Sequence, residues 1–281
     1  MVPLTDQAFR RLVSLRRDLH ERPEPSGQEA RTAAKVAARL GELGLEVRKG
    51  PYGHSVVGIL RGSKPGRTVA WRSELDALAG NSLDPMPFRS RNAGAHHGCG
   101  HDVHIAIALG IAEVLARHRD QLHGQAVFIF QPEEESFRGA RAMLDAGLFE
   151  SLAVDEIYAV HVTGLPVGQI AVRPGEMFAY PRHIRVALKD GLSATELAQV
   201  GRLVQDTLSR NPPLASPSEI QRMVDPDIGV TAAGTAFRDF LLIDELRPVR
   251  TSPGTVNLDA DLYETHVANL ATLIPRVTQA L

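Results

Sequence analysis

The N-terminal part of the chain carries apolar side chains at helical spacing. Between about residues 5 and 20 they recur every three or four positions, which predicts an amphipathic helix. A second helix is predicted from Gly27 to Leu43, because Ser26 can serve as its N-cap and Glu29 completes a capping box. Gly44 follows the last apolar position and predicts the end of this helix.

Short apolar runs between glycine and proline residues predict a set of strands. The run from Gln125 to Phe130 shows no polar alternation, which is typical of a strand covered on both faces. Helices are predicted between the strands, at Ile105–Ala116 and Ala140–Phe149. The other predicted strands are Leu45–Val47, Ser55–Leu60, Thr68–Trp71 and Glu156–Val160. We therefore expect an α/β domain, with a mixed, mainly parallel sheet flanked by helices and a site along one sheet edge.

Composition and charge narrow the class of protein. A chain of 281 residues predicts one large domain or two smaller ones, and its net charge of −2 gives no reason to expect a nucleic-acid or membrane partner. A single cysteine excludes an internal disulfide and fits a reducing compartment. The first residues mix charged and apolar side chains, unlike a signal peptide, and no apolar run is long enough for a membrane helix. We expect a cytoplasmic protein.

The segment from Ala95 to His104 concentrates side chains that bind metals. It holds four of the eleven histidines and the only cysteine, a combination of ligands that suits a transition metal such as zinc or manganese. The glycines on either side of Cys99 permit a tight turn, so that its thiolate and the His101 imidazole can face one point. The alternative is a histidine-rich surface loop beside a buried cysteine.

Carboxylates and a further histidine follow two other predicted strands. Three consecutive glutamates at a strand end are unfavourable unless they face a cation, so Glu134 and Glu135 could divide the roles of general base and metal ligand. His161 follows the strand at 156–160. The alternatives are a solvated acidic turn and a buried structural histidine. Ligands that converge from several strand ends are typical of α/β enzymes, which favours a metal site here.

In combination, these residues resemble the M20 family of metallopeptidases and amidohydrolases, especially its hippurate hydrolase and auxin-conjugate hydrolase branch. The matching motifs follow one another in the family's order from about residue 10 to residue 180. They are Leu19-His20 with Pro23-Glu24-Pro25-Ser26 and Glu29, Arg72-Ser73-Glu74-Leu75-Asp76-Ala77-Leu78, His97-Gly98-Cys99-Gly100-His101-Asp102, Phe130-Gln131-Pro132-Glu133-Glu134-Glu135, Gly139-Ala140, His161, Val167-Gly168 and Arg173-Pro174-Gly175.

The resemblance implies a zinc-exopeptidase-like fold and a reaction. The chain would be a metal-dependent amidohydrolase that cleaves a small N-acyl amino acid or related amide with water activated by the metal. Glu134 would be the general base. The implied ligands of one or two zinc or manganese ions are Cys99, His101, Glu135 and His161. The residues implied to orient these ligands are Asp76, Asp102 and His104.

The same resemblance divides the chain into two domains, with a metal-binding catalytic domain at residues 1–179. Residues 180–281 resemble the family's small α+β lid, in reduced form, and imply a homodimer through this region. The implied lid elements are a strand at Ile184–Leu188, a helix at Ala194–Arg210, strands near Gly234–Phe237 and Val249–Thr251, and a helix at Asp259–Leu281.

Three departures from the family pattern leave alternatives open. Glu74 stands where the family has aspartate, and the Gly-Gly-His segment of the lid is missing. The family's last ligand histidine, in a segment that returns to the catalytic domain, is also missing; an alignment without a lid would put Arg250 or Thr251 in its place. The alternatives are therefore a catalytically degenerate homologue that acts as a binding or assembly partner, and an M20-type exopeptidase.

Overall fold

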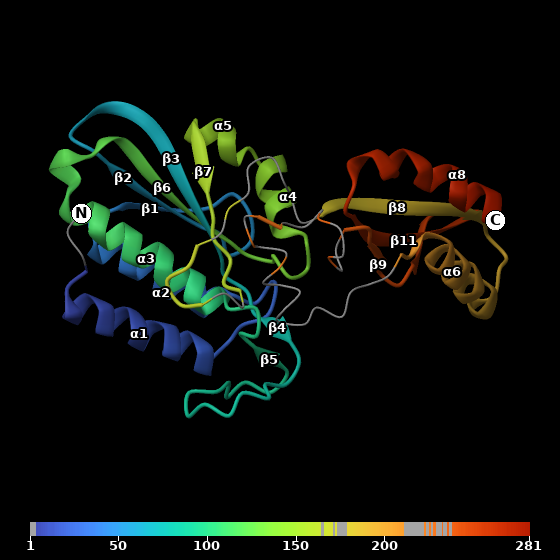
Figure 1. The fold of residues 1–281 in the computed structure, drawn as a ribbon, viewed down its shortest axis with the longest axis horizontal. Helices are drawn as coiled ribbons and strands as arrows, with labels where there is room; N and C mark the ends of the chain where they lie inside the picture. Colours follow the sequence, from blue (N-terminus) through green and yellow to red (C-terminus); the bar gives the residue numbers. More distant parts are fainter. Residues whose placement is uncertain are drawn as a thin grey trace. The chain divides into compact units, whose positions relative to one another are not determined.

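The computed structural model describes residues 4–163, 166–170, 172, 179–210, 222, 225, 227–228, 232, 235 and 238–281. It divides into two compact units, Met1–Val162 and Thr163–Leu281 (Figure 1). Each unit has a hydrophobic core of its own. Among the described residues, no helix combines the length and apolar content that crossing a membrane requires.

The first unit is built on a five-stranded sheet with the order β1-β2-β6-β3-β7. Its strands are β1 (Glu46–Lys49), β2 (Val56–Arg61), β3 (Lys64–Glu74), β6 (His123–Gln131) and β7 (Glu156–Tyr158). The β3 strand pairs in parallel with β6 and β7, whereas β1, β2 and β6 pair antiparallel. The predicted mixed sheet is confirmed, but it is not mainly parallel, because two of its four strand pairings are antiparallel. Because β3 and β6 run in parallel, their carboxyl ends meet at the same edge.

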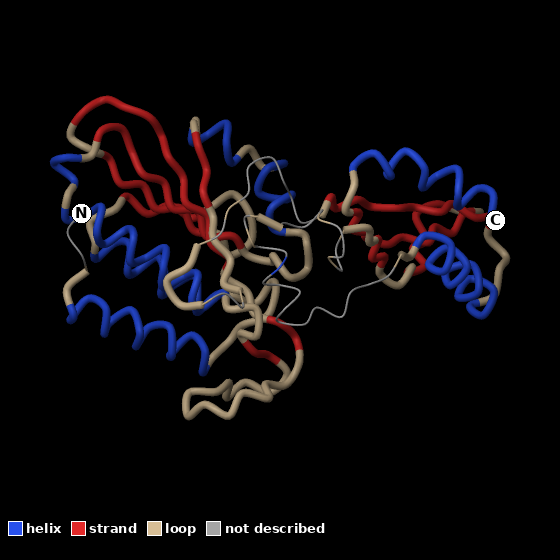
Figure 2. The backbone as a smooth tube through the Cα atoms, in the orientation of Figure 1, coloured by secondary structure: helices blue, strands red, loops and turns tan. Residues whose placement is uncertain are grey.

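Helices cover both faces of this sheet (Figures 1 and 2). One face packs against α2 (Ala30–Glu42) and α3 (His101–Arg117), with α1 (Asp6–Glu21) packed on α3, and the other face packs against α4 (Gly139–Asp145) and α5 (Leu148–Leu152). Phe128 and Phe130 point into the first core, while Val127 and Ile129 point into the second. Burial on both faces explains why β6 shows no polar alternation. The remaining short elements are β4 (Leu78–Ala79), β5 (Ala95–His96) and η1 (Arg119–Gln121).

Phe128→Ala is expected to lower the free energy of unfolding of the first unit by about 3–5 kcal/mol. The ring is 1% exposed and lies between the sheet and its helices, so truncation leaves a cavity. Urea denaturation followed by the fluorescence of Trp71, the only tryptophan and part of β3, measures this loss. Phe9→Ala is the matched control, since that ring is 60% exposed. Equal effects of the two substitutions would contradict this packing.

The predicted capping box at Ser26 and Glu29 is wrong. The α2 helix begins at Ala30, and the Glu24 carboxylate, not Ser26, accepts from the backbone N–H groups of its first turn, at Arg31 and Thr32. Ser26 Oγ instead donates to Asp76, and the buried Glu29 carboxylate accepts backbone N–H bonds from Gly27 and Glu133. Both side chains therefore bond partners in distant segments, Ser26 to Asp76 and Glu29 to Glu133.

Two further predictions in the first unit need correction. The helix expected at 140–149 is two short helices, α4 and α5, because Gly147 adopts a left-handed φ of 78° between them. The strand expected to be buried at 156–160 ends at Tyr158 and lies at the sheet edge. Ile157 and Tyr158 are therefore about half exposed, at 48% and 52%.

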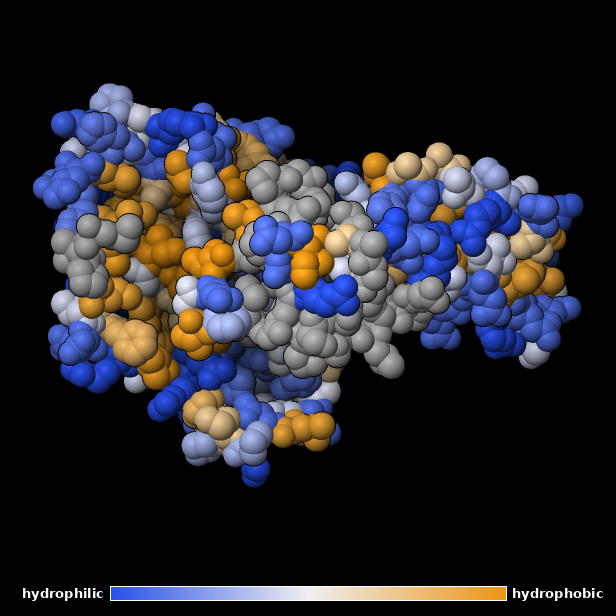
Figure 3. All heavy atoms as spheres, in the orientation of Figure 1, coloured by the Kyte–Doolittle hydropathy of each residue, from blue (hydrophilic) through white to orange (hydrophobic). Residues whose placement is uncertain are grey.

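The second unit is an antiparallel sheet packed against two helices. Its strands are β8 (Tyr180–Lys189), β9 (Leu241–Ile243), β10 (Arg247–Ser252) and β11 (Thr255–Glu264), and its helices are α6 (Ala194–Leu208) and α8 (Leu270–Ala280), with η2 (Val267–Asn269) before α8. Here a true capping box forms, between Ser193 and Glu196 at the start of α6. Apolar side chains of both helices meet those of the sheet in one core, and Figure 3 shows a mostly hydrophilic surface over this unit.

The helix predicted from Asp259 is wrong in its first part. Buried Val256, Leu258, Ala260 and Leu262 stand at every second position, which is the period of a strand, and they form β11. His266 accordingly lies before η2 rather than within a helix. The predicted motif at 173–175 lies outside the described residues, as do Gly234, Ala236 and Phe237 of the expected lid strand.

The β10 strand contradicts the alignment without a lid. That alignment places Arg250 or Thr251 in a segment that returns to the catalytic domain. Instead β10 pairs with β11, which pairs with β8, so all three belong to the sheet of the second unit.

Candidate metal centre

The carboxyl ends of β3 and β6 deliver the acidic residues of the centre. Glu74 lies opposite Gln131 in the parallel register, so the residues that follow each strand emerge side by side. The α3 helix begins at His101, directly after Gly100, whose left-handed φ is 84°. A side chain at Gly100 would come within 2.4 Å of Val162. This turn therefore requires glycine, and it presents Cys99 and His101 together.

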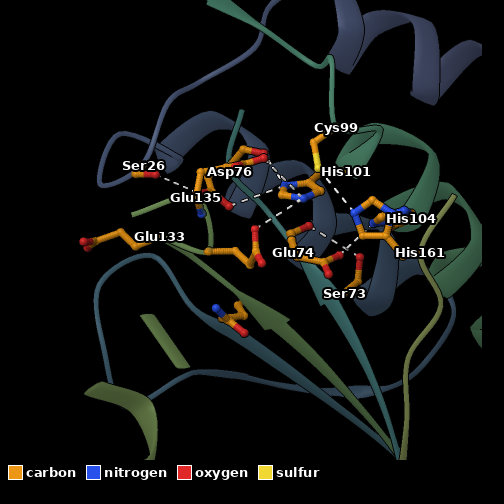
Figure 4. Close-up of polar contacts among 12 residues, drawn as sticks. Ser26, Ser73, Glu74, Asp76, Cys99, His101, His104, Glu133, Glu135 and His161 are labelled. Atoms are coloured by element: carbon orange, nitrogen blue, oxygen red, sulfur yellow. Dashed lines mark hydrogen bonds and ion pairs between the residues drawn. The ribbon is translucent and has the colours of Figure 1, made fainter. Parts of the chain in front are cut away.

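His101 lies at the middle of the centre (Figure 4). Its ring is 1% exposed, and Nδ1 donates to the backbone carbonyl of Asp76 at 2.8 Å. This bond leaves Nε2 as the unprotonated nitrogen of the neutral ring, and it faces the carboxylates of Glu134 at 3.6 Å and Glu135 at 3.7 Å. Both His101 Nε2 and Glu135 Oε1 are buried and have no hydrogen-bond partner among the described residues.

Cys99 and His161 approach the same imidazole. Cys99 Sγ lies 3.3 Å from His161 Nε2, and His161 Nδ1 bonds the carbonyl of Val162 at 2.7 Å. Ligand atoms of Cys99, His101 and His161 all lie within 4.8 Å of one another, and so do those of His101, Glu134 and Glu135. The structure thus brings together the five side chains that the sequence indicated.

Electrostatics favours a cation at this point. Burial opposes a charged His101, but Asp76 and Cys99 raise its pKa to about 11. Contact with Cys99 raises the pKa of His161 to about 9, and the two imidazoles lower the pKa of the thiol. Burial raises the pKa of Glu134. The ring nitrogens therefore lie beside a thiol whose pKa is lowered and beside two carboxyl groups, an arrangement that favours a proton or a divalent metal between them.

A buried polar network holds the His161 side of the centre. His104 Nδ1 donates to Glu74 at 2.8 Å, and its Nε2 accepts the backbone N–H of Val162 at 2.9 Å. Both ring nitrogens are occupied, so His104 supports the residue next to His161 rather than offering a ligand atom. Burial opposes a charged Glu74, but His104 and Arg72 lower its pKa to about 2.

The sequence analysis named Asp76 as an orienting residue, but not three others that support the centre: Arg72, Gln131 and Ser26. Arg72 forms an ion pair with Glu74 and donates to Gln131 Oε1 at 2.7 Å, which ties β3 to β6. Asp76 Oδ2 accepts from Ser26 at 2.7 Å and from the backbone of Glu135 at 2.9 Å. The three unidentified residues all belong to the quoted motifs, and that membership was the available signal.

Asp102 faces away from the predicted ligands. Its Oδ2 lies 2.8 Å from His20 Nδ1 and forms a 2.7 Å ion pair with Arg16, which links the start of α3 to α1. His20 also contacts Asp84 at 2.9 Å. Asp102 therefore anchors the helix that carries His101 and makes no direct contact with the ligand cluster in the described structure.

Comparison with known proteins shows which family this chain matches. The model of "Peptidase family M20/M25/M40" matches residues 70–278. N-acetylcysteine deacetylase of Bacillus subtilis is 36% identical over 222 residues, which cover 74% of this chain and 58% of that protein. N-acetyldiaminopimelate deacetylase of Listeria innocua is 32% identical over 247 residues, which cover 81% of this chain and 65% of that protein. Thermostable carboxypeptidase 2 of Saccharolobus solfataricus is 38% identical over 181 residues, which cover 63% of this chain and 46% of that protein.

A solved structure agrees with these matches. The YXEP protein of Bacillus subtilis, described as a dinuclear metal binding peptidase from the M20 family, superposes with a TM-score of 0.70 at 27% identity. The match covers 98% of this chain and 70% of that one. The chain spans about half the length of the first curated relatives it matches, 46% and 45% of them.

Proposed function

Because the chain belongs to peptidase family M20/M25/M40, we propose that it is a metal-dependent amidohydrolase acting on a small N-acyl amino acid or related amide. The observation that carries this proposal is the convergence of a thiol, two imidazoles and two carboxylates around His101. Two of the relatives are described as deacetylases of N-acetylated amino compounds, which supports an amide substrate of this kind.

The donor set fits zinc or manganese, as one or two ions. Cys99, His101, Glu135 and His161 would hold the metal. The fit is supported by two buried atoms that have no hydrogen-bond partner among the described residues, His101 Nε2 and Glu135 Oε1. A divalent metal in such a site polarises the amide carbonyl and makes water more acidic.

Glu134 is proposed as the general base. Its side chain is 31% exposed, so water and substrate can reach it, and burial raises its pKa toward the range suited to proton transfer at neutral pH. The carboxylate takes a proton from the water that attacks the carbonyl carbon and delivers a proton to the amine nitrogen as the C–N bond breaks. The products are a carboxylic acid and an amine.

Purified protein is expected to hydrolyse members of a panel of N-acyl amino acids. Treatment with EDTA should abolish the release of amine, and zinc or manganese should restore it, because the reaction depends on the metal. Amine release measured with a ninhydrin or fluorescamine assay tests this, with magnesium as the control cation. Metal-loaded protein that hydrolyses no substrate of the panel would overturn the proposal and favour the non-catalytic binding or assembly partner.

An exopeptidase is the second candidate. The relatives named as carboxypeptidases are as similar to this chain as those named as deacetylases, at 38% and 39% identity against 36% and 32%. N-blocked dipeptides belong in the same panel for this reason. A higher kcat/KM for dipeptides than for N-acetyl amino acids would select the exopeptidase.

The cytoplasmic location and the homodimer through residues 180–281 stay predictions. The first rests on the single cysteine, which fits a reducing compartment. The second rests on resemblance to the family's lid.

A further inference from the structure

The Glu29 side chain does not cap the α2 helix. It is 0% exposed, and its Oε1 accepts the backbone N–H groups of Gly27 and Glu133, each at 2.9 Å. Glu133 lies 104 residues later in the chain and directly precedes Glu134 and Glu135. A buried carboxylate from the segment before α2 therefore holds the peptide that leads into the acidic pair.

This peptide has an unfavourable backbone conformation. Glu133 has a φ of +54°, in the left-handed region that side chains other than glycine rarely adopt. Such a conformation persists only when its surroundings fix it. Here the Glu133 N–H bonds Glu29, and its carbonyl accepts from the N–H of Gly139 at 3.1 Å and of Arg138 at 3.3 Å. The peptide groups on both sides of this residue are thus held by hydrogen bonds.

A second contact from the same segment supports the turn. Ser26 Oγ donates to Asp76 Oδ2, which also accepts the backbone N–H of Glu135 (Figure 4). Two of the three N–H groups in the acidic triplet therefore end on carboxylates that the 26–29 segment provides or orients. The turn aims Glu134 and Glu135 at His101 Nε2.

We infer that Glu29 is a positioning residue that stabilises the left-handed conformation of Glu133 and so directs the two following glutamates into the metal centre. The structural part rests on hydrogen bonds alone, while its consequence for metal binding and hydrolysis rests on the proposed function. Glu29 Oε2 is buried without a hydrogen-bond partner in the described part of the chain. Glutamine keeps the accepting Oε1 and the side-chain length, and therefore provides a matched control.

Hydrogen exchange on the metal-free full chain tests the structural part. Glu29→Ala is expected to accelerate exchange of the peptide that contains residues 133–135 by about tenfold or more, because it removes the acceptor of the Glu133 N–H. Glu29→Gln should stay close to the wild type. Glu29→Asp keeps the charge but shortens the side chain, and should behave like alanine. If the alanine variant does not fold, Glu29→Asp takes its place in the exchange measurement. Wild-type exchange in folded Ala and Asp variants would overturn the inference.

Zinc affinity, measured by competition with a chromophoric chelator, tests the consequence. Glu29→Ala is expected to weaken binding about 10–100-fold, as substitutions of residues that orient ligands do, and Glu29→Gln by much less. The loss should be smaller in a Glu133→Gly background than in a Glu133→Ala background, because only glycine adopts the left-handed conformation without strain. Equal losses in both backgrounds would contradict a role through Glu133.

These results separate the two proposals. Faster exchange and weaker zinc binding in Glu29→Ala, with no hydrolysis by any protein, would leave the positioning role intact and reject the amidohydrolase. Hydrolysis by the wild type, with unchanged exchange and affinity in Glu29→Ala, would support the amidohydrolase and reject the positioning role of Glu29. If the wild type binds no zinc, the exchange measurement alone decides the role of Glu29.

Discussion

Glu134→Gln is expected to lower kcat for N-acyl amino acid hydrolysis by about 10²–10⁴-fold, the usual contribution of a general base. The amide keeps the size of the side chain but cannot take a proton from water at neutral pH. Metal content should stay at the wild-type level, since Glu134 is not among the four proposed ligands. Steady-state kinetics on the best substrate of the panel and plasma mass spectrometry on the same sample provide the two measurements.

The neighbouring glutamate offers a matched control for this substitution. Glu133 accepts a hydrogen bond from the Tyr52 hydroxyl at 3.0 Å, on the side of the turn away from His101 (Figure 4). Glu133→Gln makes the same chemical change one residue earlier and should leave kcat within about threefold, as expected of a side chain outside proton transfer. If the two variants lost activity equally, loss of charge in the turn would explain the result and Glu134 would lose its assigned role.

Cys99→Ala is expected to weaken metal binding by more than about 100-fold, beyond the 10–100-fold typical of residues that only orient ligands. The thiol lies within reach of both His101 and His161, whose contacts lower its pKa and favour the thiolate that a metal binds. Zinc titration of metal-free protein measures the loss. Activity should fall in parallel, because the metal is required for the chemistry.

The same cysteine provides an independent readout in the wild type. It is the only cysteine, so the reaction of the protein with a thiol reagent reports on this position alone. Bound zinc should slow that reaction, since a coordinated thiolate is a poorer nucleophile. His96→Ala is the control, because it removes a histidine of the same segment that lies outside the ligand clusters. Full metal content in Cys99→Ala would exclude the thiol as a ligand.

Glu74 bears on the non-catalytic alternative. Aspartate is expected at this position in the family, and a longer side chain could have disturbed the site. In the structure the extra length is accommodated, since Glu74 is 2% exposed and pairs with both Arg72 and His104. This departure from the family pattern is therefore compatible with an assembled centre. The purified protein's turnover decides between the enzyme and the binding partner.

Features that depend on neighbouring residues could be predicted from the sequence alone. The unbroken apolar run of β6 predicted a strand buried on both faces, and Cys99 and His101 lie two residues apart across a glycine that permits the turn. Motif order predicted the family, which the family model confirms. These predictions hold because backbone conformation and burial pattern are encoded over a few adjacent residues.

Features that depend on residues far apart in the chain could be seen only in the folded structure. Ser26 and Glu29 fit a helix cap locally, but the first-turn N–H groups of α2 bond the Glu24 carboxylate instead. The buried Glu29 carboxylate needs partners of its own and bonds two backbone N–H groups, one of them 104 residues away. Likewise, residues 255–264 became a strand because β8 was available to pair with them. Motifs in the sequence indicated the five side chains of the centre. Only the tertiary structure could bring together the start of α3, which carries Cys99 and His101, and the segments that follow β6 and β7.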